Sequence, residues 1–242
     1  MSGQVLLAAD YNPDTLIAKA NQAYNEGLYD SAVNLYTGVL NEGLESYELY
    51  YNLGNAYFKN NQLPSAILYY EKAKKIAPND DDVNFNLNIA NSMIVDKIEK
   101  VPELFYKRWW NYFYNAFSED KWTIFSILSW IILLSFIAVF ILTKSRNIKK
   151  ISFYLGMLFL LITIGAFGLS SQKYYYTKEN KEAIIFTPTI TAKSSPTLSA
   201  VDLFVIHEGT KVHIMDEVQG WVKIKIRNGS VGWLPSESLK RI

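Results

Sequence analysis

The chain has 242 residues, of which 50% are hydrophobic and 15% aromatic, and its 24 basic and 23 acidic side chains leave a formal net charge of +1. This length allows one or two domains. The near-equal numbers of basic and acidic residues argue against a nucleic-acid-binding protein. The sequence contains no cysteine, which excludes disulfides, thiolate nucleophiles and zinc sites with cysteine ligands.

Residues 1–10 include the stretch GQVLLAAD, a short apolar run that ends in small residues before an acidic one. This pattern is typical of the end of a secretory signal peptide. We therefore expect residues 1–10 to be a signal-peptide remnant, with a disordered tail as the alternative.

Residues 11–100 contain an internal repeat, in which Tyr36 and Tyr70 are one period of 34 residues apart. The second copy, YELYYNLGNAYFKNNQLPSAILYYEKAKKIAPND, resembles the tetratricopeptide repeat closely, and the first copy, which begins at Pro13, resembles it less. Each such repeat is a pair of helices, and stacked pairs form a solenoid. A further helical pattern follows the second copy, and we expect this helix to cap the array.

Stacked helix pairs leave a concave face that is lined by the first helix of each pair and commonly binds peptides. The repeat frame places the following candidate residues in this groove: Asn21, Asn52, Asn55, Asn86, Tyr51, Phe58 and Lys59. An asparagine amide donates and accepts hydrogen bonds, so it can hold an extended peptide or simply tie adjacent helices together, and both uses stay open. A subclass of tetratricopeptide domains clamps a C-terminal carboxylate with basic residues, but Ile17, Asp82 and Asn86 occupy those places. We therefore do not expect this groove to recognise a carboxylate.

Residues 101–120 carry aromatic side chains near helical spacing, and we expect an interfacial amphipathic helix there. Residues 121–173 then contain two uncharged runs of 22 residues, 122–143 and 151–172, each long enough to cross a bilayer. The seven residues between them predict a tight transmembrane hairpin. Two buried helices of a soluble domain are the alternative.

The loop of the hairpin is basic and has no acidic residue; it contains Lys144, Arg146, Lys149 and Lys150. The positive-inside rule favours a cytoplasmic loop by density of charge, with both flanking domains on the opposite side of the membrane, whereas the raw count does not, because six basic residues flank the hairpin: Lys107, Arg108, Lys121, Lys173, Lys178 and Lys181. Residues 174–182 follow as a linker that begins with three tyrosines, which are typical of a membrane interface.

Residues 183–242 change to short β-rich runs separated by turn residues. In WVKIKI, apolar residues alternate with Trp221 and lysines, and Asn228-Gly229 then supplies a hairpin turn toward Trp233. Together with the stretches KSSP, EGTKV and GWL, this pattern resembles a bacterial SH3 domain, and we expect residues 180–242 to fold alone as a barrel. Trp221 and Trp233 are candidates for a binding surface, with core packing as the alternative.

The fold class predicted for the whole chain is multidomain: an all-α tetratricopeptide solenoid, two transmembrane helices and an all-β SH3-like barrel. This order of parts resembles the BatE type of aerotolerance-operon protein. The resemblance implies an export signal, periplasmic soluble domains on a multi-pass protein of the bacterial inner membrane, and neighbours that include a MoxR-type AAA ATPase and membrane proteins with von Willebrand A domains.

The function predicted from these parts is that of a non-enzymatic, membrane-anchored adaptor that binds proteins in a stress or aerotolerance complex. The alternative is an envelope sensor whose SH3-like domain binds peptidoglycan. We predict no cofactor, no metal and no catalytic residue, because His207 and His213, the two histidines of the chain, have no evident catalytic companions in the sequence.

Overall fold

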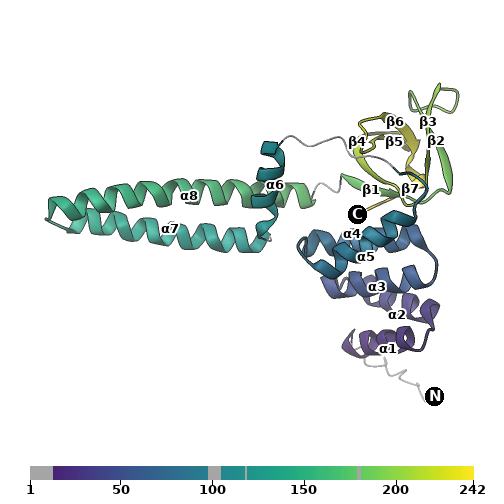
Figure 1. The fold of residues 1–242 in the computed structure, drawn as a ribbon, viewed down its shortest axis with the longest axis horizontal. Helices are drawn as coiled ribbons and strands as arrows, with labels where there is room; N and C mark the ends of the chain where they lie inside the picture. The colour runs from purple at the N-terminus through teal and green to yellow at the C-terminus, as the bar shows by residue number, and fades with distance from the viewer. Residues whose placement is uncertain (1–12, 98–104, 118, 179–180) are drawn as a thin grey trace, which may run out of the picture. The chain divides into compact units, whose positions relative to one another are not determined.

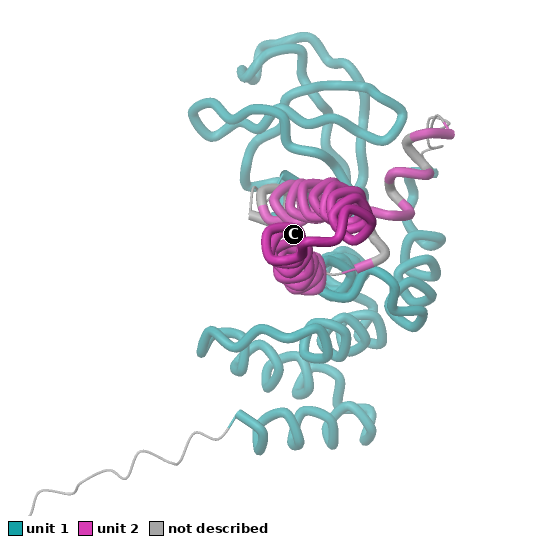
Figure 2. Tube along the Cα trace, turned by 90° about the vertical axis from the view of Figure 1, so that its left-hand side faces the viewer, with its two compact units in different colours: residues 1–101, 181–242 teal, residues 102–180 magenta. Residues whose placement is uncertain are grey.

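A computed structural model describes residues 13–97, 105–117, 119–178 and 181–242. The chain forms two compact units, drawn in different colours in Figure 2. One unit combines residues 1–101 with residues 181–242, and the other is residues 102–180. The predicted signal-peptide remnant, residues 1–10, lies outside the described residues.

The first part of unit 1 is a stack of helices, α1 to α5 (Figure 1). Their bounds are Pro13–Asn25, Tyr29–Asn41, Tyr47–Lys59, Leu63–Ile76 and Asp81–Met93. Two side chains cap these helices: Ser46 Oγ accepts a hydrogen bond from Leu49 N (3.1 Å), and Asp80 Oδ1 accepts one from Val83 N (2.9 Å). Helices α3 and α4 repeat α1 and α2 with the predicted period, so the prediction of a tetratricopeptide solenoid is confirmed.

Small residues explain why the helices pack so closely. Ala20, Ala32 and Ala66 are fully buried, and Gly54 faces the ring of the buried Tyr70. A larger residue at any of these positions would push the helices apart, because protein interiors have few voids.

The second part of unit 1 is an antiparallel sheet that, among the described residues, has seven strands in the order β3-β2-β6-β5-β4-β1-β7. The strands β1 to β7 are Glu182–Ile185, Thr189–Lys193, Asp202–His207, Lys211–Val218, Trp221–Lys225, Val231–Pro235 and Leu239–Arg241. Gly229 has a φ of +95°, which favours glycine and places the predicted turn between β5 and β6. The SH3-like prediction is confirmed.

The SH3-like domain packs directly on the helices. Strand β1 is apolar on both faces: Ala183 and Ile185 join the core of the sheet, whereas Ile184 joins a core with Ala66 and Ile67 of α4. That residues 180–242 fold alone stays a prediction, and separating the domain from the repeats would expose Ile184, which is fully buried.

Unit 2 consists of α6 (Phe105–Ala116), α7 (Glu119–Leu142) and α8 (Arg146–Lys178). Helices α7 and α8 are long and apolar enough to cross a membrane, with spans of 23 and 29 residues at Asp120–Leu142 and Arg146–Tyr174. Hydroxyl groups join them, since Thr163 Oγ1 donates to Ser129 Oγ (2.9 Å). Lys173 on α8 donates to the carbonyl of Phe117 (2.7 Å), which follows α6.

Two predicted boundaries of unit 2 differ from the observed ones. The expected loop of seven residues is shorter, because α8 already begins at Arg146. Helix α8 also continues to Lys178, through residues that were expected to form the linker 174–182. Both differences have the same cause. The uncharged runs predict only the membrane-spanning part of each helix, whereas the helix itself continues into the polar residues on either side.

Candidate binding surfaces

The asparagines of the repeats are held by tyrosines. Asn21 on α1 and Asn55 on α3 occupy equivalent repeat positions, and the Oδ1 atom of each accepts a hydrogen bond from a buried tyrosine hydroxyl. The donors are Tyr36 (2.5 Å) and Tyr70 (2.7 Å). Burial raises the pKa of Tyr36 to about 12, with a further contribution from Tyr24, and burial also raises the pKa of Tyr70. Both hydroxyls therefore stay protonated and keep donating at neutral pH.

A second set of contacts joins α3 to α5. Asn86 Nδ2 donates to Asn55 Oδ1 (2.9 Å) and to Tyr51 Oη (3.1 Å), so the structure brings three of the predicted groove residues together. Asn21 instead pairs with Tyr36. The amides of Asn55 and Asn86 thus do tie adjacent helices together, which was one of the two uses left open by the sequence.

The other predicted groove residues differ in exposure. Asn52 is half-buried on α3, and Lys59 is exposed in the last turn of the same helix. Phe58 packs against the core that the helices share with the SH3-like domain. Peptide binding in the groove stays a prediction for all seven residues.

The two tryptophans lie on the outer face of the sheet. Val222 and Ile224 of β5 are buried in the core, and Trp221 alternates with them on the opposite face, half-buried. Trp221 is paired in register with Pro235, and Trp233 with Lys223, whose Nζ lies 5.8 Å from the centroid of the Trp233 ring. We call these four residues (Trp221, Lys223, Trp233 and Pro235) the tryptophan face.

Asp96, which follows α5, binds the turn between β3 and β4. Its Oδ2 accepts hydrogen bonds from the backbone N–H of His207 and from the hydroxyl of Thr210, both at 2.8 Å, and its Oδ1 lies 2.8 Å from His207 Nδ1. Burial by itself raises the pKa of the Asp96 carboxyl, but the hydrogen bonds from His207 and Thr210 outweigh burial, so the pKa is lowered. A charged carboxylate therefore joins the repeats to the SH3-like domain.

Lys211 of β4 makes a second polar connection between the two domains. Its Nζ lies 2.9 Å from Glu71 Oε2 on α4 and 2.7 Å from Glu182 Oε2 on β1. Burial lowers the pKa of Lys211, but the two carboxylates raise it by more, so the ammonium stays charged. The sequence did not reveal this contact; the one available signal is that the acidic Glu71 follows the buried Ile67 by four residues on an otherwise apolar helix face.

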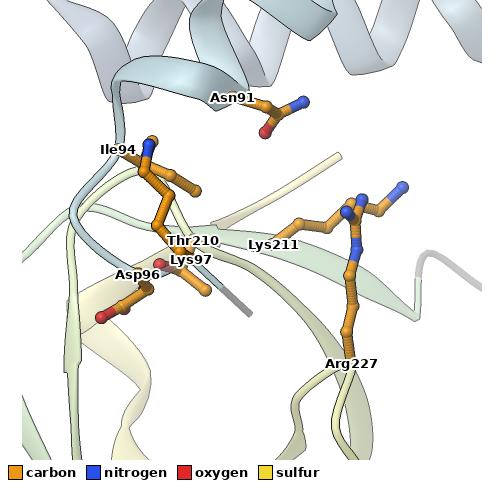
Figure 3. A pocket seen from close by; sticks show the side chains of 7 residues that line it. All are labelled: Asn91, Ile94, Asp96, Lys97, Thr210, Lys211 and Arg227. Atoms are coloured by element: carbon orange, nitrogen blue, oxygen red, sulfur yellow. Dashed lines mark hydrogen bonds between the residues drawn. The ribbon is translucent and has the colours of Figure 1, made fainter. Parts of the chain in front are cut away.

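A cleft of about 320 Å³ lies between the end of α5 and the SH3-like domain, and we call it the interdomain cleft. It is lined by Asn91, Ile94, Asp96, Lys97, Thr210, Lys211 and Arg227 (Figure 3). In this view, Asn91 and Arg227 approach the cleft from opposite sides, whereas the carboxylate of Asp96 points away from both. This cleft was not predictable from the sequence, because its walls come from segments more than a hundred residues apart.

Within the described residues, no group of three or more histidine, cysteine or acidic side chains is placed to hold a metal ion. Of the two histidines, His207 is engaged by Asp96, and His213 is paired in register with Lys225 on β5.

Comparison with known protein families agrees with this architecture. The tetratricopeptide repeat family matches residues 47–80, and the bacterial SH3 domain family matches residues 192–240. No curated protein matches the chain. The chain therefore combines two kinds of domain that typically bind other molecules and do not catalyse reactions.

Proposed function

We propose that this protein is a membrane-anchored adaptor that binds extended segments of partner proteins in the concave groove of its repeats. The observation that carries the proposal is the pair of equivalent amides on Asn21 and Asn55. Their oxygens are occupied by tyrosine hydroxyls, and, among the described residues, their Nδ2 groups make no hydrogen bond. Two N–H donors held at a fixed spacing suit the carbonyls of an extended peptide.

The hairpin of unit 2 would anchor this adaptor in a membrane. Because the repeats and the SH3-like domain contact each other, both lie on one side of that membrane, and a tether there raises their effective concentration toward a shared partner. The basic hairpin loop favours the periplasmic side of a bacterial inner membrane. From the resemblance to aerotolerance-operon proteins, we further propose that the protein works in a stress complex. Its partners there would be a MoxR-type ATPase and membrane proteins with von Willebrand A domains.

Photo-crosslinking in native membranes tests the groove. A photoreactive residue replaces Asn52 on α3 or, as a matched control, the exposed Asn34 on α2, the second helix of its pair. We expect a discrete protein adduct from position 52 and none from position 34. Equal adducts from both positions, or none from position 52, would contradict groove binding.

Single cysteines test the orientation, since the natural chain has none. Ser145, which precedes α8, and Ser236, which follows β6, are both exposed. In intact spheroplasts, we expect a membrane-impermeant thiol reagent to label Ser236→Cys and to spare Ser145→Cys. The reverse pattern would show that the protein has the opposite orientation.

A second candidate function, peptidoglycan binding by the SH3-like domain, is favoured by the tryptophan face. Half-buried indoles on an outer sheet face can stack on a sugar or a peptide. If this candidate is correct, Trp221→Ala and Trp233→Ala will abolish retention on isolated sacculi while the protein stays folded. Retention of both variants at the level of the parent protein would remove the candidate.

A further inference from the structure

Some basic side chains of unit 1 are paired with carboxylates. Lys193 pairs with Asp202, and Arg241 pairs with Glu217. Arg227 and Lys97 both line the cleft, and neither has a carboxylate partner among the described residues. An arginine at the wall of a cleft presents fixed N–H donors, which match the geometry of a carboxylate or a phosphate.

The charges around the cleft leave room for one anion. Lys211 and Lys75 are balanced by Glu71 and Glu182, which lie close to both lysines. Within the cleft itself, Asp96 offsets one of the two remaining cations, Arg227 and Lys97, which leaves an excess of about one positive charge. This excess matches one monoanionic carboxylate, and a further cation, Lys225, lies outside the cleft in an adjoining hollow.

An adjoining hollow of about 400 Å³ shares Lys211 and Arg227 with the cleft and adds His213 and Lys225. Together the two spaces can hold a short stretch of chain and not only a small ion. The cleft also offers the amide of Asn91 for a peptide hydrogen bond and the side chain of Ile94 for an apolar contact.

From these observations we infer that the interdomain cleft is a second binding site, and that it takes the C-terminal carboxylate of a peptide, with Arg227 as its principal contact. The site rests on the proposed function, since it serves the same adaptor. Because its walls come from both domains, the site exists only while the SH3-like domain is seated on the repeats.

The experiment uses the full chain in detergent micelles. The probes are two pools of N-acetylated tetrapeptides of random sequence, one with free C-terminal carboxylates and one with C-terminal amides, and retention is measured by equilibrium dialysis and mass spectrometry. The variants are Arg227→Gln and, as a matched control, Arg241→Gln, an exposed arginine of the same domain outside the cleft.

We expect the protein to retain the free-acid pool about 10- to 100-fold better than the amide pool, the range expected for a hydrogen-bonded charge pair. Arg227→Gln should abolish this preference, and Arg241→Gln should leave it intact. Equal retention of both pools by the parent protein, or an unchanged preference in Arg227→Gln, would overturn the inference. It would also be overturned if inorganic phosphate or phosphatidylglycerol vesicles bound in an Arg227-dependent way while the free-acid pool did not.

The result of this peptide-retention experiment can be told apart from the result of the photo-crosslinking experiment on the groove. Adducts from position 52 without a carboxylate preference would leave the adaptor proposal standing and remove only this second site. A carboxylate preference without those adducts would remove groove binding and leave the cleft.

Discussion

The close contact between Gly54 and Tyr70 makes a sharp test of the repeat packing. A Cβ atom on Gly54 would lie 2.7 Å from both Cδ1 and Cε1 of Tyr70, well inside the usual separation of about 3.5 Å for carbon atoms. The ring has little freedom to move, because Tyr70 is 1% exposed and its hydroxyl is bonded to Asn55. Overpacking of this kind costs about 1–3 kcal/mol.

Gly38 of α2 provides the matched control, since a Cβ atom there would meet nothing within 4 Å. In both helices, glycine to alanine improves helix propensity by about 1 kcal/mol. We therefore expect Gly38→Ala to stabilise the repeats by up to about 1 kcal/mol. Gly54→Ala should be less stable than Gly38→Ala by the overpacking cost of about 1–3 kcal/mol, and Gly54→Leu should be worse still.

Hydrogen exchange of the α3 and α4 amides, followed by mass spectrometry on the full chain in detergent, measures this difference. The full chain is needed because part of α4 is covered by the SH3-like domain. A difference of 1–3 kcal/mol corresponds to exchange that is about 5- to 150-fold faster in Gly54→Ala. Equal protection of Gly54→Ala and Gly38→Ala would refute the assignment of Gly54 to a helix contact.

Three further outcomes follow from the junction of the two domains. Gly209 and Gly220 both have a φ near +80°, but only at Gly209 would a Cβ atom collide with Ile94, so Gly209→Ala should loosen the junction in hydrogen exchange and Gly220→Ala should not. Because the pKa of Asp96 is lowered, its stabilising effect is fully present above about pH 4, the pKa of an unfolded aspartate, and is lost as the pH falls through the lower folded value. Protection of the β3–β4 turn, measured relative to the intrinsic exchange rate at each pH, should therefore fall with acidification in the parent and depend less on pH in Asp96→Asn. An isolated fragment of residues 181–242 should melt at a lower temperature than the same residues in the full chain, and an equal melting temperature would show that the junction adds no stability.

The repeats were predictable because their signal is local and periodic. Small residues recur where helices touch, and tyrosines recur one period later to fill the space between pairs, so a single sequence reveals both the helices and their pairing. Alternation in β5 likewise placed Trp221 opposite the core. The groove asparagines were located in the same way, but an amide suits two uses, and residue identity alone does not choose between them.

The junction between the domains was not predictable, for an equally physical reason. The hydrogen bond from Thr210 to Asp96 spans 114 residues, and that from Lys211 to Glu71 spans 140. No periodicity connects such distant residues, and each is an ordinary surface residue type taken alone. The stretch EGTKV, which contains Gly209, is part of the SH3-like pattern, but that pattern does not indicate which surface the turn contacts.

The interruption of unit 1 by residues 102–180 also has a consequence for the order of events during synthesis. Strand β1 is made only after both long apolar helices, which at about 5–20 residues per second is a delay of about 4–16 s after the repeats are complete. During that interval, Ile67 of α4 lacks its partner Ile184, and Glu71 lacks Lys211. A nascent chain stalled within the hairpin would therefore expose this apolar surface of α4 to chaperones and proteases. Completion of the chain would bury the surface under the SH3-like domain.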